Sequence, residues 1–255
     1  MNKIYAFLLL PVLLLSCGKS KEPATMTLLT YNVGVFSKYE DDTTPQVAEL
    51  IRGTGASLVA LNELDSCNRR HAAYQLKELA ARLGDWSFQF ASAFPYAGGA
   101  YGNGVVSRDK VISRYKVHLP KSDGSEPRSI AVVETDRCVF ASVHLDYVGE
   151  MSQRVQVEAL NDWFKAVYGK SRKPVFLCGD FNAEPDSEAI SLMREDWTQL
   201  TGTDFTYSTK NPRKCIDYIF AYKAAAPVEV LSSEVLTTGT ESFSDHFPVK
   251  VVVKF

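Results

Sequence analysis

Short apolar runs alternate with amphipathic stretches along the chain, and this pattern predicts strands that alternate with helices. Several runs are rich in β-branched or aromatic residues and are bounded by turn residues, as buried strands are. The predicted strands cover residues 26–33, 57–63, 175–177, 215–222 and 247–255. Residues 101–108 predict a turn that leads into another strand, and residues 129–146 predict a hairpin around Asp136.

Three stretches place their apolar residues on one helical face. The first runs from Pro45 to Arg52, and we expect it to stop at Gly53. The second covers residues 72–83, with Gly84 after it at a position that favours glycine. The third covers residues 152–168, and its predicted apolar face consists of Val157, Leu160, Phe164 and Val167. Because both hairpins and helical crossovers occur, we expect an α/β domain with mixed sheets and helices on the outer faces.

Polar side chains recur where the predicted strands end. In "VFLCGDFNAEPDS" an apolar run ends in Asp180 and Asn182, which project to the same side of an extended chain. The other such residues are Asn32, Glu63, His144, Asp217, Asp245 and His246. Each of them alone has an ordinary structural reading as a turn, a cap or a paired buried group. A single shared site accounts for all of them together.

The residue types in this set suit a hard metal ion and a water molecule. Oxygen ligands without a cysteine or histidine cluster are typical of Mg²⁺ or Mn²⁺ sites. Glu63 and Asn32 can hold such an ion at one corner of the site. Asp180 can orient and deprotonate a water molecule that attacks phosphorus.

The remaining candidates suit a phosphate group. Asn182 and His144 can donate hydrogen bonds to phosphate oxygens. His246, if a carboxylate keeps it protonated, can stabilise the negative charge of the transition state. Asp217 and Asp245 are both candidates for that carboxylate, and the sequence leaves the choice open.

Seven motifs follow one another in the order "TYNVG", "LNELD", "YGNGVVSR", "SVHLD", "GDFNAEP", "IDYIF" and "SDHFPV". This ordered series resembles the endonuclease/exonuclease/phosphatase superfamily, also called deoxyribonuclease I-like, over nearly all of residues 26–255. The resemblance implies a four-layer α/β sandwich in which two mixed β-sheets pack face to face, with helices on the outer faces. It also implies that the site lies at one end of the two sheets.

The resemblance further implies a role for each candidate residue. It places Asn32, Glu63 and Asp245 at a Mg²⁺ (or Mn²⁺) site, and it assigns catalysis to Asp180, Asn182, His144, Asp217 and His246. Asn62 stands where the family usually has Gln, and the shorter amide changes the surroundings of the metal site. Candidates for contact with the substrate are Asn103, Arg70 and Arg213, although a solvated surface is the alternative for both arginines.

Composition restricts the substrate without identifying it. The formal net charge of the 255-residue chain is −2, so there is no general basic field to attract nucleic acid. A duplex nuclease would be expected to meet several phosphates with Lys or Arg side chains. We therefore expect a monomeric metal-dependent phosphoesterase that acts on a small or lipid-derived phosphate ester. An extracytoplasmic nuclease and a non-catalytic binding lipoprotein of the same fold are the alternatives.

The N-terminus differs from the rest of the chain. Residues 1–16 contain one Lys and an apolar stretch that is short for a membrane span but typical of a signal peptide. "LLLSC" resembles the lipobox of bacterial lipoproteins, which implies cleavage before Cys17 and lipid on that residue. Residues 17–25 then form the lipidated cysteine and a tether, and residues 26–255 form the catalytic domain. An ordinary secretory peptide is the alternative.

The remaining cysteines carry no metal-site spacing. Cys138 and Cys178 lie within apolar runs and are expected in the core. Cys67 and Cys215 lie near candidate site residues, and an oxidising compartment would permit a bridge between them. The sequence does not supply the geometry that would decide this question.

The lipobox generates the first testable prediction. We expect residues 1–16 to be absent from the mature protein and Cys17 to carry lipid, which places the protein on the extracytoplasmic side of a bacterial membrane. Mass spectrometry of the native N-terminus measures both features. An intact bond between residues 16 and 17, or an unmodified Cys17, would contradict the prediction.

Overall fold

The structure is a computed structural model that describes residues 25–122 and 124–255. The predicted signal peptide, Cys17 and the tether up to residue 24 lie outside the described residues, while Thr25 already belongs to the first strand. None of the helices in the described ranges is long and apolar enough to cross a membrane.

The first of two six-stranded sheets is built around the N-terminal strand. Its strands in spatial order are β11 (Glu229–Val235), β12 (Val249–Lys254), β1 (Thr25–Asn32), β2 (Leu58–Ser66), β4 (Gly99–Ser107) and β3 (Ser87–Tyr96). The central pair β1 and β2 is parallel, and every other pair is antiparallel. The sheet is therefore mixed, as predicted.

The second sheet repeats this arrangement with strands from the middle of the chain, whereas the first sheet combines strands from both of its ends. Its strands in spatial order are β5 (Val111–His118), β6 (Ser129–Thr135), β7 (Val139–His144), β8 (Val175–Asp180), β10 (Asp217–Tyr222) and β9 (Trp197–Gln199). Again the central pair, β7 and β8, is parallel, and its neighbours are antiparallel. Parallel neighbours need a crossover, which the helix between them supplies.

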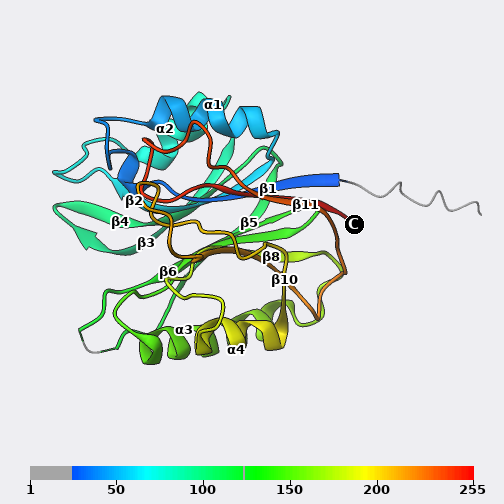
Figure 1. Cartoon of the computed structure of the whole chain (residues 1–255). Coiled ribbons are helices and arrows are strands. Elements are labelled where there is room, and N and C mark those ends of the chain that lie inside the picture. Colours follow the sequence, from blue (N-terminus) through cyan, green and yellow to red (C-terminus); the bar gives the residue numbers. More distant parts are fainter. Residues whose placement is uncertain (1–24, 123) are drawn as a thin grey trace, which may run out of the picture.

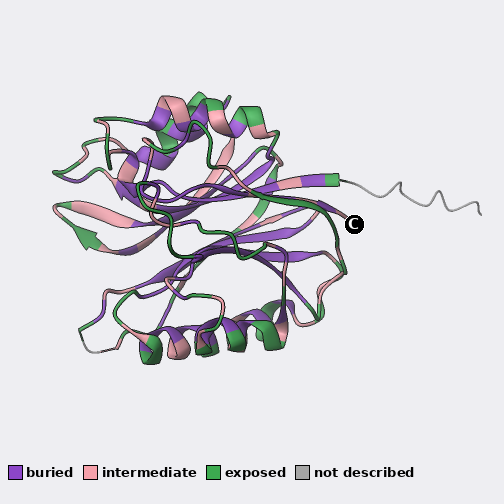
Figure 2. Ribbon diagram, in the orientation of Figure 1, coloured by how far each residue is buried: buried purple, intermediate pink, exposed green. Residues whose placement is uncertain are grey.

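Helices cover the outer face of each sheet (Figure 1). The first sheet carries α1 (Thr44–Thr54) and α2 (Gln75–Arg82), and the second carries α3 (Glu150–Tyr168) and α4 (Glu188–Asp196). Three apolar clusters result, one between the two sheets and one under each pair of helices. Figure 2 shows buried strands in the middle of the molecule and exposed outer faces on the helices. This is the predicted four-layer sandwich.

Burial on both faces explains why the central strands read as continuous apolar runs. In β1, Leu28 faces the core between the sheets and Leu29 faces the helices. In β8, Phe176 faces the core between the sheets and Leu177 faces α3 and α4. Consecutive side chains thus enter different cores, and both positions must be apolar.

Two helix predictions differ from the structure. Helix α1 passes through Gly53 and ends at Thr54, and the capping residue Gly55 has a φ of 70°, in the left-handed region that glycine tolerates. Val167 was predicted on the buried face of α3, but it is 46% exposed. The neighbouring Tyr168 packs its ring against Phe164 and fills that position instead.

Gly179 in β8 marks a very close approach between neighbouring strands. It lies opposite Val143 of β7, and a Cβ atom added at this glycine would come within 1.8 Å of the Val143 carbonyl oxygen. Its φ of 143° also disfavours other residues. Because Asp180 follows directly, this approach fixes where the candidate base lies relative to β7.

We predict that Gly179→Ala lowers the free energy of unfolding by about 1–3 kcal/mol, because the added methyl group collides with the backbone of β7. Gly53→Ala is the matched control, since a Cβ atom at Gly53 meets nothing within 4 Å. It should raise stability by about 0.5–1 kcal/mol in the helix. Urea unfolding measures both variants, and a Gly179→Ala protein as stable as the parent would refute the close approach.

Candidate active site

A pocket of about 400 Å³ lies where the central strands of both sheets end. Its lining comprises Glu63, His144, Asp180, Asn182, Asp245 and His246 together with Lys38, Tyr101, Glu126, Arg128, Tyr147, Tyr207, Lys214 and Ile216. A larger hollow of about 560 Å³ lies beside Phe205 and β11, but its lining contains no histidine and no basic residue. The smaller pocket is therefore the place where the candidate chemistry gathers.

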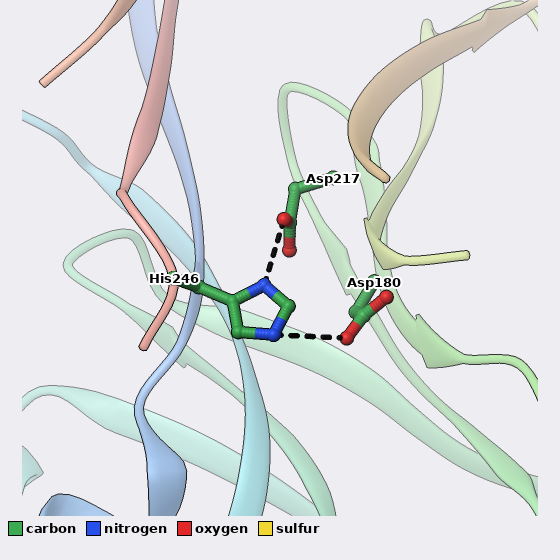
Figure 3. A group of neighbouring side chains, drawn as sticks. All are labelled: Asp180, Asp217 and His246. Carbon is green, nitrogen blue, oxygen red and sulfur yellow. Dashed lines mark hydrogen bonds and ion pairs between the residues drawn. The ribbon is translucent and has the colours of Figure 1, made fainter. Parts of the chain in front are cut away.

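His246 lies between two buried carboxylates (Figure 3). Its Nδ1 donates to Asp217 Oδ2 at 2.8 Å, and its Nε2 lies 3.6 Å from Asp180 Oδ2. Burial lowers the pKa of His246, but the charges of Asp217 and Asp180 outweigh burial and raise the pKa to about 10. The imidazole is therefore a positively charged donor at neutral pH, with Asp217 as the carboxylate that orients it.

Asp180 is held ready to accept a proton. Its Oδ1 accepts from the backbone N–H of Asn182 at 2.8 Å, and its Oδ2 accepts from Asn32 Nδ2 at 3.0 Å. Burial raises the pKa of Asp180 above the ordinary carboxyl value, while the positive charge of His246 opposes the rise. A general base is most effective when its pKa lies near the working pH. Asp180 therefore has the surroundings that such a base needs.

Asn32 joins the base to the candidate metal ligand. Its Oδ1 accepts from the backbone N–H of Gly34 at 3.1 Å, which turns the amide nitrogen toward the carboxylates. That nitrogen donates to Glu63 Oε1 at 3.1 Å and to Asp180 Oδ2. Asn32 thus positions Glu63, and in this orientation it does not present its own oxygen to an ion.

Glu63 reaches the pocket because β2 contains a bulge. The pairing of β2 with β4 shifts register between Leu61 and Leu64, and Glu63 has a φ of 56°. A bulge redirects a side chain that regular pleating would place elsewhere. The predicted strand end at Glu63 is therefore wrong, since β2 continues to Ser66 beyond the bulge.

Asn62 connects the two sheets beside the site. Its Oδ1 accepts from the backbone N–H of Asp180 at 3.0 Å, and its Nδ2 donates to the carbonyl of Val143 at 2.8 Å. One amide on β2 therefore holds the ends of β7 and β8 together. Because Asn62 binds the backbone of Asp180 directly, the length of this amide side chain affects the position of Asp180.

Asp245 does not contact the imidazole through a hydrogen bond but pairs with a lysine. Its Oδ2 lies 2.7 Å from Lys38 Nζ, and both residues line the pocket. This ion pair raises the pKa of Lys38, against the opposing effect of burial. Sequence reasoning missed Lys38, because it lies in a loop without a recognisable strand-end motif.

The pocket carboxylates fit a divalent metal ion of the hard type. Glu63 is half-buried and lines the pocket. Its hydrogen bond with Asn32 uses Oε1, which leaves Oε2 available to an ion. Ligand atoms of Asp180, Asp217 and His246 also lie within 4.8 Å of one another. A metal ion bound among these three residues would compete with the protonated imidazole of His246, which already pairs with Asp217. We therefore favour Glu63 as the main ligand for Mg²⁺ or Mn²⁺.

Arg128 and His144 also line the pocket, and His144 Nε2 lies 3.4 Å from Asp180 Oδ2. Arg128 is buried, its Nε has no hydrogen-bond partner among the described residues, and its Nη2 lies 3.5 Å from Glu126. Burial, followed by the charges of Arg128 and His246, lowers the pKa of His144, which is therefore neutral. Sequence reasoning missed Arg128, whose only signal is its place just before a predicted hairpin.

The three predicted substrate-binding residues lie outside the pocket lining. Asn103 is buried and donates to the carbonyl of Ser129 at 2.6 Å. Arg70 binds Asp65 through Nε and Nη2 at 2.7 and 2.9 Å, and its guanidinium lies over the ring of Tyr96. Arg213 is exposed. Their contact with substrate stays a prediction that the pocket geometry does not support.

The cysteines of the described ranges are all free thiols. Cys138 and Cys178 are buried in the core between the sheets, as predicted. Cys67 is exposed and Cys215 is buried, and the structure contains no bridge between them. The site is therefore assembled by hydrogen bonds and ion pairs.

A family model described as the Endonuclease/Exonuclease/phosphatase family matches residues 29–246, and this range includes every candidate residue of the pocket named above. The chain belongs to the endonuclease/exonuclease/phosphatase family. Members of this family are hydrolases that act on phosphoester bonds. No curated protein sequence matches the chain.

Solved structures of this family share the fold. An endonuclease/exonuclease/phosphatase from Beutenbergia cavernae has a TM-score of 0.73 and 22% identity, over 91% of this chain and 72% of its own. A mannosyl-6-phosphatase of Bacteroides thetaiotaomicron has a TM-score of 0.71 and 17% identity, over 90% and 100%. The human Nocturnin catalytic domain has a TM-score of 0.71 and 18% identity, over 90% and 93%. At these identities the likeness shows the fold alone.

The ion pair at His246 predicts a pH-dependent contribution to stability. A histidine whose pKa is raised stabilises the fold fully below its ordinary value of about 6.5, and the gain is lost as pH rises through the folded value. The parent should therefore be more stable than Asp217→Asn at about pH 6.5, and the difference should shrink as pH rises through about 10. Urea unfolding in EDTA measures it, and a pH-independent difference would contradict the assignment.

Proposed function

We propose that the chain is a divalent-metal-dependent phosphoesterase that acts on the extracytoplasmic side of a bacterial membrane, tethered through lipid on Cys17. One observation supports the chemistry above the others. A buried carboxylate that can take a proton, Asp180, lies 3.6 Å from a histidine that Asp217 keeps charged. Base and cation thus face one pocket, as in-line attack on a phosphate ester requires.

Asp180 is the group that activates the attacking water. The backbone N–H of Asn182 fixes one carboxylate oxygen and the amide of Asn32 fixes the other, so the carboxylate enters the reaction in one orientation. The proton of the water passes to Asp180 as its oxygen attacks phosphorus, while the bond between phosphorus and the ester oxygen breaks and that oxygen, once protonated by solvent, leaves as an alcohol. Fixing the reacting groups in advance lowers the entropic part of the barrier.

Charged and neutral donors around the pocket receive the phosphate oxygens. His246 donates through Nε2–H, the neutral His144 donates through one ring N–H, and Arg128 brings a guanidinium without a full set of partners. A Mg²⁺ or Mn²⁺ ion held by Glu63 would supply further neutralisation of the phosphate charge. Together these groups favour the more negative transition state.

The pocket supports a small phosphate ester as substrate. The basic residues Lys38, Arg128 and Lys214 are balanced by acidic residues in the same lining, so they form no uninterrupted basic groove. A nuclease would be expected to neutralise several successive phosphates. One solved neighbour is a mannosyl-6-phosphatase, which is consistent with a small substrate. We therefore favour this function over a nuclease or a non-catalytic binding protein, and we propose that the chain acts as a monomer.

Turnover by an Asp180→Asn variant tests this function. Purified protein is first screened with Mg²⁺ or Mn²⁺ on aryl phosphates, sugar phosphates, lipid head-group diesters and nucleic acids. On the best substrate, Asp180→Asn should lower turnover by about 10²–10⁴, because it removes the proton acceptor while keeping the shape.

Asp186→Asn is the matched control for this substitution, since Asp186 is an exposed acid in the loop that follows Asp180. It should retain parental turnover, and melting curves should show that both variants fold. Near-parental turnover in a folded Asp180→Asn protein would show that Asp180 has only a structural role at the end of its strand. Absence of turnover on every phosphate ester in the screen would count against the function itself.

A further inference from the structure

Lys38 places a positive charge beside the candidate metal ligand Asp245, in the same pocket as Glu63. Its ammonium lies 2.7 Å from Asp245 and also experiences the negative charge of Glu63, and the lysine lines the pocket with Tyr207. The Lys38 side chain is 42% exposed, whereas that of Asp245 is 11% exposed. Lys38 is therefore the more accessible partner of this ion pair.

The turn that delivers Lys38 is strained. Gly34, Val35 and Phe36 have φ values of 52°, 51° and 55°, so three consecutive residues lie in the left-handed region. A β-branched residue such as Val35 is rare there, because its side chain clashes with the backbone in that conformation. Strain of this kind persists only where surrounding contacts determine the conformation, and it is concentrated at functional sites.

Hydrogen bonds from two elements hold the strained turn. Gln75 of α2 donates from Nε2 to the Val35 carbonyl at 2.5 Å. Thr43, just before α1, donates from its backbone N–H and from Oγ1 to the Phe36 carbonyl, at 2.8 and 3.1 Å. The carbonyls of Val35 and Phe36 are thus satisfied by side chains or backbone from outside the turn.

A buried acid fixes the residue next to Lys38. Ser37 Oγ lies 3.0 Å from His71 Nε2, and His71 Nδ1 donates to Asp65 Oδ2 at 2.6 Å. Asp65 is fully buried and is held in addition by Arg70. The chain of contacts from Asp65 through His71 to Ser37 anchors the backbone from which Lys38 extends.

We propose that Lys38 is the resident cation of the active site and occupies the place that a second divalent ion would take. This inference rests on the proposed function. An ammonium paired with Asp245 neutralises that carboxylate, so a second ion could use it only by breaking the pair and leaving a lysine beside another cation. Glu63 then holds a single divalent ion, and Lys38 donates to a phosphate oxygen across the pocket.

The number of Mn²⁺ ions bound per chain measures the first part of this proposal. Calorimetric titration of metal-free protein should give one Mn²⁺ in the parent and two in Lys38→Met, because the freed Asp245 becomes a ligand. Lys38→Arg keeps the charge and should bind one. Lys77→Met is the matched control, since Lys77 is exposed on α2 and its loss changes the net charge equally.

The affinity for inorganic phosphate, titrated with one Mn²⁺ per chain so that no variant carries a second ion, measures the second part. Lys38→Met should bind phosphate about tenfold more weakly or worse, as expected when a charge-assisted hydrogen bond is lost. Lys38→Arg should recover most of this affinity, and Lys77→Met should match the parent. Melting curves establish that each variant is folded before it is titrated.

The outcomes separate this proposal from the function on which it rests. A parent chain that binds two Mn²⁺ ions, a Lys38→Met protein that still binds one, or unchanged phosphate affinity in that variant would overturn the role of Lys38. A parent that binds no Mn²⁺, or a Glu63→Gln variant that binds it as tightly as the parent, would instead overturn the metal-dependent function. If Lys38→Met fails to fold, the ion count of the parent alone still decides the first part.

Discussion

The contact between the ends of the two central strand pairs is the constraint on which the site depends. Asn62 crosses the sandwich from β2 and bonds both the Val143 carbonyl of β7 and the Asp180 backbone N–H of β8. Because the strands of both pairs are parallel, their carboxyl ends meet at one edge of the sandwich. The side chains that end three of these strands, Asn32, His144 and Asp180, are therefore brought to the same place, and the close approach at Gly179 leaves them little freedom to shift.

This placement requires the protein to bury charges that it could not bury singly. Asp180, Asp217 and His246 are nearly inaccessible to solvent, and moving isolated charges out of water is very costly. The cost is offset where the groups satisfy one another, with the imidazolium between two carboxylates. A purely stabilising core would use apolar residues of similar volume here. Retention of the ionic cluster is therefore best explained by its chemistry.

The sequence predicted the parts of the fold that are buried on both faces. Strands β1, β7 and β8 read as continuous apolar runs because each face packs against a different core. The edge strand β11 was missed, since it is exposed along almost its whole length and mixes Glu and Ser with apolar residues. Edge strands β3 and β5 were missed as well, and they too are only partly buried. Tertiary pairing, not local pattern, makes these segments strands.

The site residues also divide into those that a strand pattern reveals and those that it does not. Residues at the ends of predicted strands, such as Asp180 and His144, could be found because strand geometry places them together. Lys38 and Arg128 could not, since their positions depend on a strained turn and on the segment before β6. Strand ends thus supply Asp180, Asp217 and His144, while the turn before α1 and the segment before β6 supply Lys38 and Arg128. Loops vary more readily than core strands, so the hydrolytic chemistry follows from the fold, and the choice of phosphate ester follows from residues that strand patterns do not reveal.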